Sequence, residues 1–303
     1  MDQFLMSLIP WGTEAIIWAQ SFRNGFLDLF FRGVTLLGEE EFYLLFLPLI
    51  YWCVDKGIGI GLAYVSLSSV YLNSVLKLIF RIPRPSDPRI VHLWTANDPS
   101  FPSGHAQDAV ANWGYLAARF RRRAFTALAA VLILLIAFSR LYLGVHYPQD
   151  LVGGLLAGVV LLALYGRPAA TLGRRLAGLP LAAKLALSVI VPLALLFLHP
   201  ADTGGAYPAK RAATTMGAIL GMSVGFTLEE KYVGFTVDGS WGRRALRFVL
   251  GMAVAATFYL GLKALLPTGV AYPLAIALRT LRYSLVGLAI AFLAPWLFMK
   301  AGV

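Results

Sequence analysis

Cysteine, acidic residues and charged residues of any kind are scarce in this chain. The single cysteine, Cys53, cannot form an internal disulfide, so the cysteine content does not indicate a redox compartment. Charged residues make up 14% of the 303 residues and hydrophobic residues 59%, whereas soluble domains average about 25% and about 45–50%. This balance excludes an ordinary soluble domain and predicts an all-α protein that crosses a membrane several times.

The first 40 residues also lack an uninterrupted apolar run of the roughly 20 residues that a membrane span needs. Proline, glycine and charged residues break the stretch 5–37 repeatedly, for example at Pro10, Glu14 and Arg23. We therefore predict one or two amphipathic helices at the membrane interface within residues 1–40. The chain starts with one acid and no basic segment, so we do not expect a cleaved signal peptide.

Beyond residue 40 the apolar runs predict a polytopic transmembrane helix bundle of about nine spans. We place these spans at 41–55, 57–80, 105–119, 124–142, 149–166, 183–199, 212–228, 248–266 and 281–299. The intervening stretch 167–182 is rich in Arg, Gly and Pro and is the best candidate for a linker. The predicted organisation is therefore a core of five spans at 41–166, a cytoplasmic linker at 167–182 and an accessory bundle of four spans at 183–303.

The net charge of +11 raises the question of nucleic acid binding. However, Lys and Arg lie in short clusters between apolar runs, as in membrane-protein loops, so we expect no nucleic acid partner. Alternating the predicted spans places 14 of the 26 Lys and Arg residues but only 4 of the 15 acids on one face, which we assign to the cytoplasm. The loops 81–104 and 140–148 then lie on the extracytoplasmic side, and we expect the inner membrane of a bacterium.

Polar residues follow one face of the predicted span 57–80. Spacings of 3, 4 and 4 residues place four of them on one side of a helix: Ser66, Ser69, Asn73 and Lys77. Such a stripe in a membrane helix faces the bundle or a watery cavity. A lysine at the end of a span often extends to the interface, but Arg84 follows seven residues later. Because Lys and Arg are the usual partners of phosphate, we predict a phosphate-binding pair.

The segment 101–105 reads FPSGH and precedes an apolar run. Pro102 ends the loop, Ser103 is placed to cap a helix, and Gly104 allows a close approach of the backbone. A helix start directs free N–H groups at an anion, and His105 beside it can protonate a leaving group. Asp108 shares the His105 face, where we expect it to act on the electrostatics of the helix start. For this segment alone, a capped helix start without catalytic function is the alternative.

A third segment, 139–150, reads SRLYLGVHYPQD. Arg140 ends a predicted span, and Pro148 suits the first turn of the next helix. Asp150 then lies in that turn, where it can accept a hydrogen bond from one nitrogen of His146 and leave the other nitrogen as a nucleophile. A structural hydrogen bond is the alternative for this pair, but the two other phosphate-type segments predicted on the same side favour catalysis.

The patterns K-x6-RP, PSGH and S-R-x5-H-x3-D together resemble the three-part signature of the type 2 phosphatidic acid phosphatase superfamily. All signature positions match in order within residues 41–166, and both ends of the chain lie outside the resemblance. Lipid-type members commonly have fewer spans than we predict here. The span count is more similar to the sphingosine-phosphate phosphatase and glucose-6-phosphatase branches.

The resemblance implies a metal-independent phosphatase without a cofactor. By that resemblance His146 attacks phosphorus to form a phosphohistidine, Asp150 orients it, and His105 protonates the leaving group. The implied ligands of the phosphoryl oxygens come from all three segments: Lys77, Arg84, Ser103, Gly104 and Arg140. Around them, or in the loop 86–100 that we expect to set specificity, we place Asn73, Pro102, Asp108, Trp94 and Asn97. For Trp94, anchoring at the membrane interface is the alternative.

We therefore expect an integral membrane phosphatase that hydrolyses a lipid phosphate monoester or pyrophosphate at the extracytoplasmic face, with membrane lipids as its surroundings. One alternative is a phosphatase of a soluble phosphate ester, such as a sugar phosphate. Another is a non-enzymatic transporter or binding protein for lipid phosphates. Haloperoxidase chemistry, which also occurs in the superfamily, is disfavoured by the membrane setting.

Overall fold

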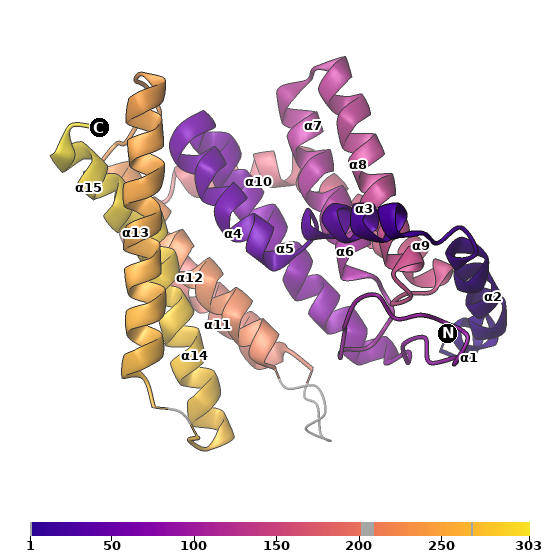
Figure 1. The fold of residues 1–303 in the computed structure, drawn as a ribbon. Coiled ribbons are helices and arrows are strands. Elements are labelled where there is room, and N and C mark those ends of the chain that lie inside the picture. The colour runs from indigo at the N-terminus through magenta and orange to yellow at the C-terminus, as the bar shows by residue number, and fades with distance from the viewer. Residues whose placement is uncertain (1, 201–208, 268) are drawn as a thin grey trace. The chain divides into compact units, whose positions relative to one another are not determined.

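The computed structural model describes residues 2–200, 209–267 and 269–303, and every regular element in these ranges is a helix (Figure 1). The α-helices (α) and π-helical segments (η) are, in chain order, α1 (Asp2–Ser7), α2 (Ile9–Gln20), α3 (Gly25–Leu36), α4 (Glu40–Leu49), η1 (Ile50–Val54), α5 (Lys56–Phe80), α6 (Gly104–Ala109), η2 (Val110–Gly114), α7 (Tyr115–Phe120), α8 (Arg123–Tyr142), α9 (Pro148–Leu164), α10 (Arg167–Ala177), α11 (Leu181–Leu198), α12 (Lys210–Tyr232), α13 (Trp241–Leu265), α14 (Tyr272–Leu288), η3 (Ala289–Leu293) and α15 (Ala294–Ala301). The predicted all-α class is confirmed.

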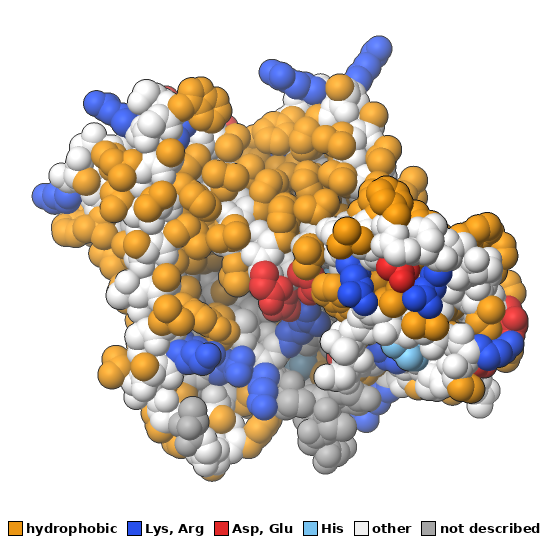
Figure 2. All heavy atoms as spheres, viewed as in Figure 1, with side chains coloured by type: hydrophobic (Ala, Val, Ile, Leu, Met, Phe, Trp, Pro, Cys, Tyr) orange, Lys and Arg blue, Asp and Glu red, His pale blue; other side chains and the backbone are white. Residues whose placement is uncertain are grey.

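Five helical stretches are long and apolar enough to cross a membrane: 56–80, 123–142, 181–198, 241–265 and 272–301. The bent pair α9 and α10 would make a sixth. Hydrophobic side chains also cover much of the visible surface (Figure 2). The chain is therefore an integral membrane protein.

The predicted count of nine spans is not confirmed. Helices do occupy the predicted spans 41–55, 105–119 and 212–228, but they are shorter or less apolar than the five stretches above. In α12, for example, Glu229, Glu230 and Lys231 lie close to the helix end and lower its mean hydropathy. The nine-span topology stays a prediction.

The chain forms two compact units. Unit 1 consists of residues 1–43 and 72–169, and unit 2 of residues 44–71 and 170–303. All three motif segments belong to unit 1. The division predicted from the sequence, with boundaries at 40, 166 and 182, stays a prediction, and the structure adds that residues 44–71 group with the C-terminal helices.

In unit 1, two glycines of α9 allow α6 to pack closely against it. A Cβ atom at Gly154 would clash with the Ser103 carbonyl oxygen, and one at Gly158 would lie 2.7 Å from the Cβ of Val110, the first residue of η2. Real Cβ atoms essentially never approach this closely, so these positions require glycine. The close packing fixes the start of α6, which carries His105, against the start of α9.

The N-terminal helices α1 to α3 belong to unit 1, and α3 crosses α8 (Figure 1). One face of these helices is buried, with Ile16 and Phe31 in apolar clusters. Large apolar side chains of the same helices are exposed, including Trp11, Trp18 and Phe26. Helices thus occupy the N-terminal stretch, whereas their amphipathic character and their position at a membrane interface stay predictions.

The loop between α5 and α6 is fixed by hydrogen bonds rather than by regular structure. The Gln20 side chain of α2 donates to the carbonyls of Val91 and Tyr142 at 2.8 and 2.9 Å, and it accepts from the Val91 N–H at 2.9 Å. The Ser100 N–H donates to the Ile82 carbonyl at 2.7 Å. These bonds satisfy the backbone of a long loop and set the position of its residues.

In unit 2, α12 and α14 pack closely through small residues. A Cβ atom at Gly217 would lie 2.5 Å from the Thr280 carbonyl oxygen. At one end of the unit, Lys56 pairs with the fully buried Glu229 at 2.6 Å. The Lys56–Glu229 ion pair is one of the contacts that hold residues 44–71 to the C-terminal helices.

Candidate active site

His146 and Asp150 form a buried pair at the start of α9. Pro148 occupies the first turn of this helix, and the Asp150 Oδ2 atom accepts from the Tyr147 N–H at 2.8 Å, which closes the helix N-terminus. The same Oδ2 lies 3.2 Å from the His146 Nδ1 and also accepts from the Ser100 hydroxyl. His146 is 1% exposed and Asp150 is fully buried. The carboxylate therefore holds the imidazole with Nδ1 as the donor and Nε2 directed away from Asp150.

Arg84 occupies the space in front of the His146 Nε2 atom. Its Nη1 lies 3.0 Å from that nitrogen and donates to the Val145 carbonyl at 2.7 Å. Burial, followed by the positive charges of Arg84, Lys77 and Arg140, holds the pKa of His146 well below its ordinary value. His146 is therefore neutral near pH 7, the state in which an imidazole nitrogen is nucleophilic.

Asp98 bridges the two cations of the first motif. Its carboxylate lies 2.5 Å from the Arg84 Nη2 and 2.8 Å from the Lys77 Nζ. Backbone carbonyls complete the arrangement, because Lys77 donates to Pro99 and Arg84 to Asp98. Although burial opposes ionisation, the charges of Lys77 and Arg84 hold the pKa of the Asp98 carboxyl well below its usual range. An anionic group already lies where the sequence predicts phosphate.

The FPSGH segment begins α6 as predicted, but Ser103 does not cap the helix. Its backbone is extended at the N-cap position, whereas its side chain makes no capping hydrogen bond. The Ser103 side chain is fully buried, and its hydroxyl has no partner among the described residues. Ser103 is buried because it packs closely against α9, where its N–H donates to the Asp150 carbonyl at 2.9 Å. A buried hydroxyl of this kind is suited to hydrogen-bond a ligand.

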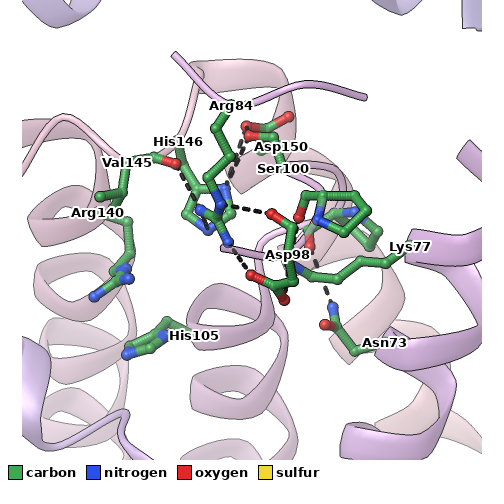
Figure 3. A network of polar contacts seen from close by, with 12 residues as sticks. Asn73, Lys77, Arg84, Asp98, Ser100, His105, Arg140, Val145, His146 and Asp150 are labelled. Atoms are coloured by element: carbon green, nitrogen blue, oxygen red, sulfur yellow. Dashed lines mark hydrogen bonds and ion pairs between the residues drawn. The ribbon is translucent and has the colours of Figure 1, made fainter. Parts of the chain in front are cut away.

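Arg140 and His105 meet an acid from another part of the chain, Glu39. The His105 Nε2 lies 3.1 Å from the Glu39 Oε1, and the Arg140 Nη1 lies 3.9 Å from the same oxygen. Arg140 also donates to the Thr35 hydroxyl at 2.6 Å. Figure 3 shows Arg84, His146, Arg140 and His105 grouped on one side of Asp98, with Lys77 on the other. The structure thus brings the residues of all three motifs to one place.

The remaining predicted residues lie around this centre. Asn73 donates to the Pro102 carbonyl at 3.2 Å and to the Gln107 side chain at 3.1 Å, so it supports the start of α6. A Cβ atom at Gly104 would lie 3.1 Å from the Asn73 Oδ1, so a larger residue there would have to displace the Asn73 side chain slightly. Asp108 is buried one turn beyond His105.

The two predicted specificity residues differ in their surroundings. Trp94 packs against the apolar cluster that contains Phe31 and Tyr142, and its hydrogen bond to Glu39 is one of the interactions that lower the pKa of that carboxyl. Asn97 is exposed on the loop beside Asp98. Trp94 is therefore close to the site, whereas the structure places Asn97 at the surface.

Three residues of the site were not predicted as site residues: Glu39, Asp98 and Ser100. Asp98 lies in the loop 86–100, which we expected to set specificity, but its pairing with Lys77 and Arg84 depends on how that loop folds. Glu39 belongs to a run of three acids before an apolar stretch, which the charge pattern alone assigns to a solvated loop. Within residues 2–200, 209–267 and 269–303, no group of three or more His, Cys, Asp or Glu is arranged to hold a metal ion.

Two family models match the chain. The model described as the PAP2 superfamily matches residues 58–170, and the one described as the transmembrane extension of PAP2 superfamily phosphatases matches residues 213–303. Together they cover more than half of the chain. The first match contains all three motifs.

Similar proteins include a probable sphingosine-1-phosphate phosphatase of Dictyostelium discoideum, with 31% identity over 76% of this chain and 60% of that protein. Sphingosine-1-phosphate phosphatase 2 of Mus musculus is 33% identical over 67% of this chain and 59% of its own length. This chain thus spans about 60% of the length of these relatives.

Among solved structures, a transmembrane PAP2-type phosphatidylglycerolphosphate phosphatase of Bacillus subtilis is similar over 55% of this chain and 87% of its own, with 24% identity and a TM-score of 0.48. The family assignment rests on the two family matches. They agree with the motif geometry in unit 1 and with the apolar helices of the C-terminal part. The chain belongs to the PAP2 superfamily.

Proposed function

We propose that this protein is a membrane phosphatase that hydrolyses a lipid phosphate through a phosphohistidine intermediate on His146. The observation that carries the proposal is the buried His146–Asp150 pair, which faces Arg84 within a group of cations. A neutral imidazole held by a carboxylate and surrounded by positive charge is suited to attack a phosphoryl group. The sphingosine-1-phosphate phosphatases among the relatives support a lipid phosphate as the substrate.

In the first step the lone pair of the His146 Nε2 forms a bond to phosphorus. The electrons of the bond between phosphorus and the leaving oxygen pass to that oxygen, which takes a proton from His105. Asp150 accepts the hydrogen bond from Nδ1 and stabilises the positive charge that develops on the His146 ring. No metal ion is required in this scheme, because the cations of the protein compensate the phosphoryl charge.

Binding of the phosphoryl group requires Lys77 and Arg84 to exchange at least part of their contact with Asp98 for phosphoryl oxygens. The Ser103 hydroxyl, the Gly104 N–H and Arg140 supply further donors. Such donors stabilise the charge of the transition state more than that of the ground state when they are held in advance. The Asn73 side chain holds the start of α6 through the Pro102 carbonyl, and the Thr35 hydroxyl holds Arg140.

In the second step water attacks phosphorus and the bond to His146 breaks, which releases inorganic phosphate. His105, now neutral, accepts the proton of the attacking water, so both histidines return to their starting states. The same steps apply to a pyrophosphate, for which the leaving group is a phosphate ester.

The location of the site is also part of the proposal. The distribution of Lys and Arg supports an extracytoplasmic site near the ends of the helices, where an amphiphilic substrate can enter from the membrane. The predicted setting in a bacterial inner membrane has no support from the two curated relatives named above, which are eukaryotic.

The test uses the full-length protein purified in detergent without added metal and in the presence of a chelator. We expect release of phosphate from sphingosine 1-phosphate, inhibition by vanadate, and a loss of about 10⁴-fold or more in His146→Ala. His199→Ala is the matched control, because His199 is a buried histidine of unit 2. A panel with phosphatidate, an isoprenoid pyrophosphate and glucose 6-phosphate defines the substrate class. Phosphate release that His146→Ala leaves unchanged would contradict the proposal.

A further inference from the structure

The turn between α3 and α4 contacts the ring of His105 directly. The N–H of Gly38 donates to the Thr35 carbonyl at 2.9 Å and that of Glu39 to the Leu36 carbonyl at 3.2 Å, so the turn is well defined. A Cβ atom at Gly38 would lie only 2.7 Å from the His105 Cδ2. Glycine at this position therefore lets the backbone approach the imidazole and brings the next residue, Glu39, to its edge.

Glu39 contacts two residues of the proposed site at once. Its Oε1 lies 3.1 Å from the His105 Nε2 and 3.9 Å from the Arg140 Nη1. Burial opposes ionisation of Glu39, but the contacts with His105 and the charge of Arg140 outweigh it, so the pKa of this carboxyl is below its usual value. Glu39 therefore provides a negative charge beside His105.

The two histidines of the site share a cationic environment but differ in the charge of their nearest ionised neighbour, which is Arg84 for His146 and Glu39 for His105. His146 is buried among cations, which favour its neutral form. His105 faces Glu39 from the α3–α4 turn and Arg140 from α8, with Asp150 on the neighbouring α9 and Asp108 on its own helix. Because Glu39 makes the closest of these contacts, it favours the protonated form of His105. A nucleophile and a general acid require this difference.

We propose that Glu39 is a positioning residue that keeps His105 protonated and aimed at the leaving oxygen, an inference that rests on the proposed function. In the first step the His105 imidazolium gives the proton of Nδ1, the nitrogen that does not face Glu39, to the leaving oxygen as that oxygen takes the electrons of its bond to phosphorus. Glu39 keeps its negative charge throughout and touches neither the substrate nor phosphorus. The turn before α4 thus affects protonation of the leaving oxygen only through His105.

The dependence of the rate on the leaving group separates this role from a structural one. An alkoxide needs a proton to leave, whereas a nitrophenolate does not. We therefore compare Glu39→Gln with wild type on dodecyl phosphate and on a nitrophenyl phosphate with a chain of similar length, in single-turnover experiments that read the phosphoryl-transfer step. The matched control is Glu41→Gln, which changes an exposed acid two residues further along the chain.

We expect Glu39→Gln to slow the reaction of the alkyl phosphate about 10- to 100-fold and that of the nitrophenyl phosphate less than about 3-fold. Glu41→Gln should stay within about 2-fold of wild type on both substrates. Equal losses on both substrates would show a structural role. A faster reaction of the alkyl phosphate would show that Glu39 only competes with phosphate. Either result would overturn the proposal.

A second readout does not depend on turnover. In protein with isotopically labelled histidine, NMR follows the ionisation of His105, and we expect its midpoint to lie about one pH unit lower in Glu39→Gln than in wild type. An unchanged midpoint would overturn the role of Glu39. If instead wild type hydrolyses neither substrate while the midpoint moves as expected, the proposed function fails and the electrostatic role of Glu39 stands.

Discussion

At His146, burial and the charges of three cations act in the same direction. Both disfavour the imidazolium form, so the pKa of this group is well below 6.5 in the folded protein. The protein thereby keeps its nucleophile neutral without a strong base. Asp150 contributes orientation and compensates the charge that appears when the Nε2 lone pair is used.

This environment predicts the acid side of the pH profile. As the pH falls, His146 of the free enzyme stays neutral until the pH reaches its lowered pKa, so the acid-side loss of kcat/KM that this residue causes should lie well below pH 6.5. Lys77→Met removes one of the charges that disfavour the imidazolium, so the loss should move to higher pH. The measurement is kcat/KM as a function of pH for both proteins, because this ratio reports ionisation in the free enzyme. A loss centred near pH 6.5 that Lys77→Met does not move would contradict this account.

Contacts between site residues could be predicted only where the spacing of the two residues along the chain brings them together. His146 and Asp150 are four residues apart at a helix start, so local geometry alone brings them together. Glu39 and His105 are 66 residues apart in the sequence, and their contact depends on how α3 packs on α8. No periodicity marks such a pair, although a glycine before an acid at the start of an apolar run is a weak signal.

Among the elements, α6 and α9 matter most for the site, because each begins at a proposed catalytic histidine. Glycines on α9 allow the two helix starts to meet, and the Ser103 N–H joins them through the Asp150 carbonyl. The motifs at 101–105 and 139–150 predicted the starts of both helices. The motifs did not predict that the Ser103 side chain makes no capping hydrogen bond. The orientation of this side chain depends on packing against the neighbouring helix rather than on local sequence.

This packing predicts the effect of a larger residue at Gly154. A Cβ atom there meets a backbone carbonyl, which cannot move aside as a side chain can. Gly154→Val should therefore separate α6 from α9, lower the stability by about 1–3 kcal/mol and reduce activity at least about 10-fold. Thermal unfolding and phosphate release measure the two effects.

Gly33→Ala is the control, because no heavy atom lies within 4 Å of its Cβ position in α3. It should keep full activity and leave stability unchanged or raised by about 0.5–1 kcal/mol. If Gly154→Val matched this control in both measurements, the close contact of α6 and α9 would not be needed for the site.

At the scale of the whole molecule, composition predicted an integral membrane protein of helices, whereas the number of spans could not be settled by apolar runs. Helices such as α12 contain glycine, threonine and charged residues because they pack against other helices rather than against lipid. Hydropathy therefore loses its discriminating power for these segments. The charge asymmetry is less sensitive to such helices and still predicts an orientation.

The orientation is tested with single cysteines. In a Cys53→Ala background, Ser86→Cys lies in the exposed part of the loop between α5 and α6, and Arg122→Cys lies in the basic turn before α8. A thiol reagent that does not cross membranes should label Ser86→Cys in intact cells and Arg122→Cys only after the membrane is opened. Labelling of both positions in intact cells would contradict the predicted orientation.

The most direct measurement of the central claim is to trap the phosphorylated protein. Purified wild type is mixed with radiolabelled sphingosine 1-phosphate, quenched within one turnover at alkaline pH, where phosphohistidine survives, and digested for mass spectrometry. The account predicts phosphate on the peptide that contains His146, and none in the His146→Ala protein. Turnover without a phosphorylated peptide, or phosphate on a residue other than His146, would contradict it.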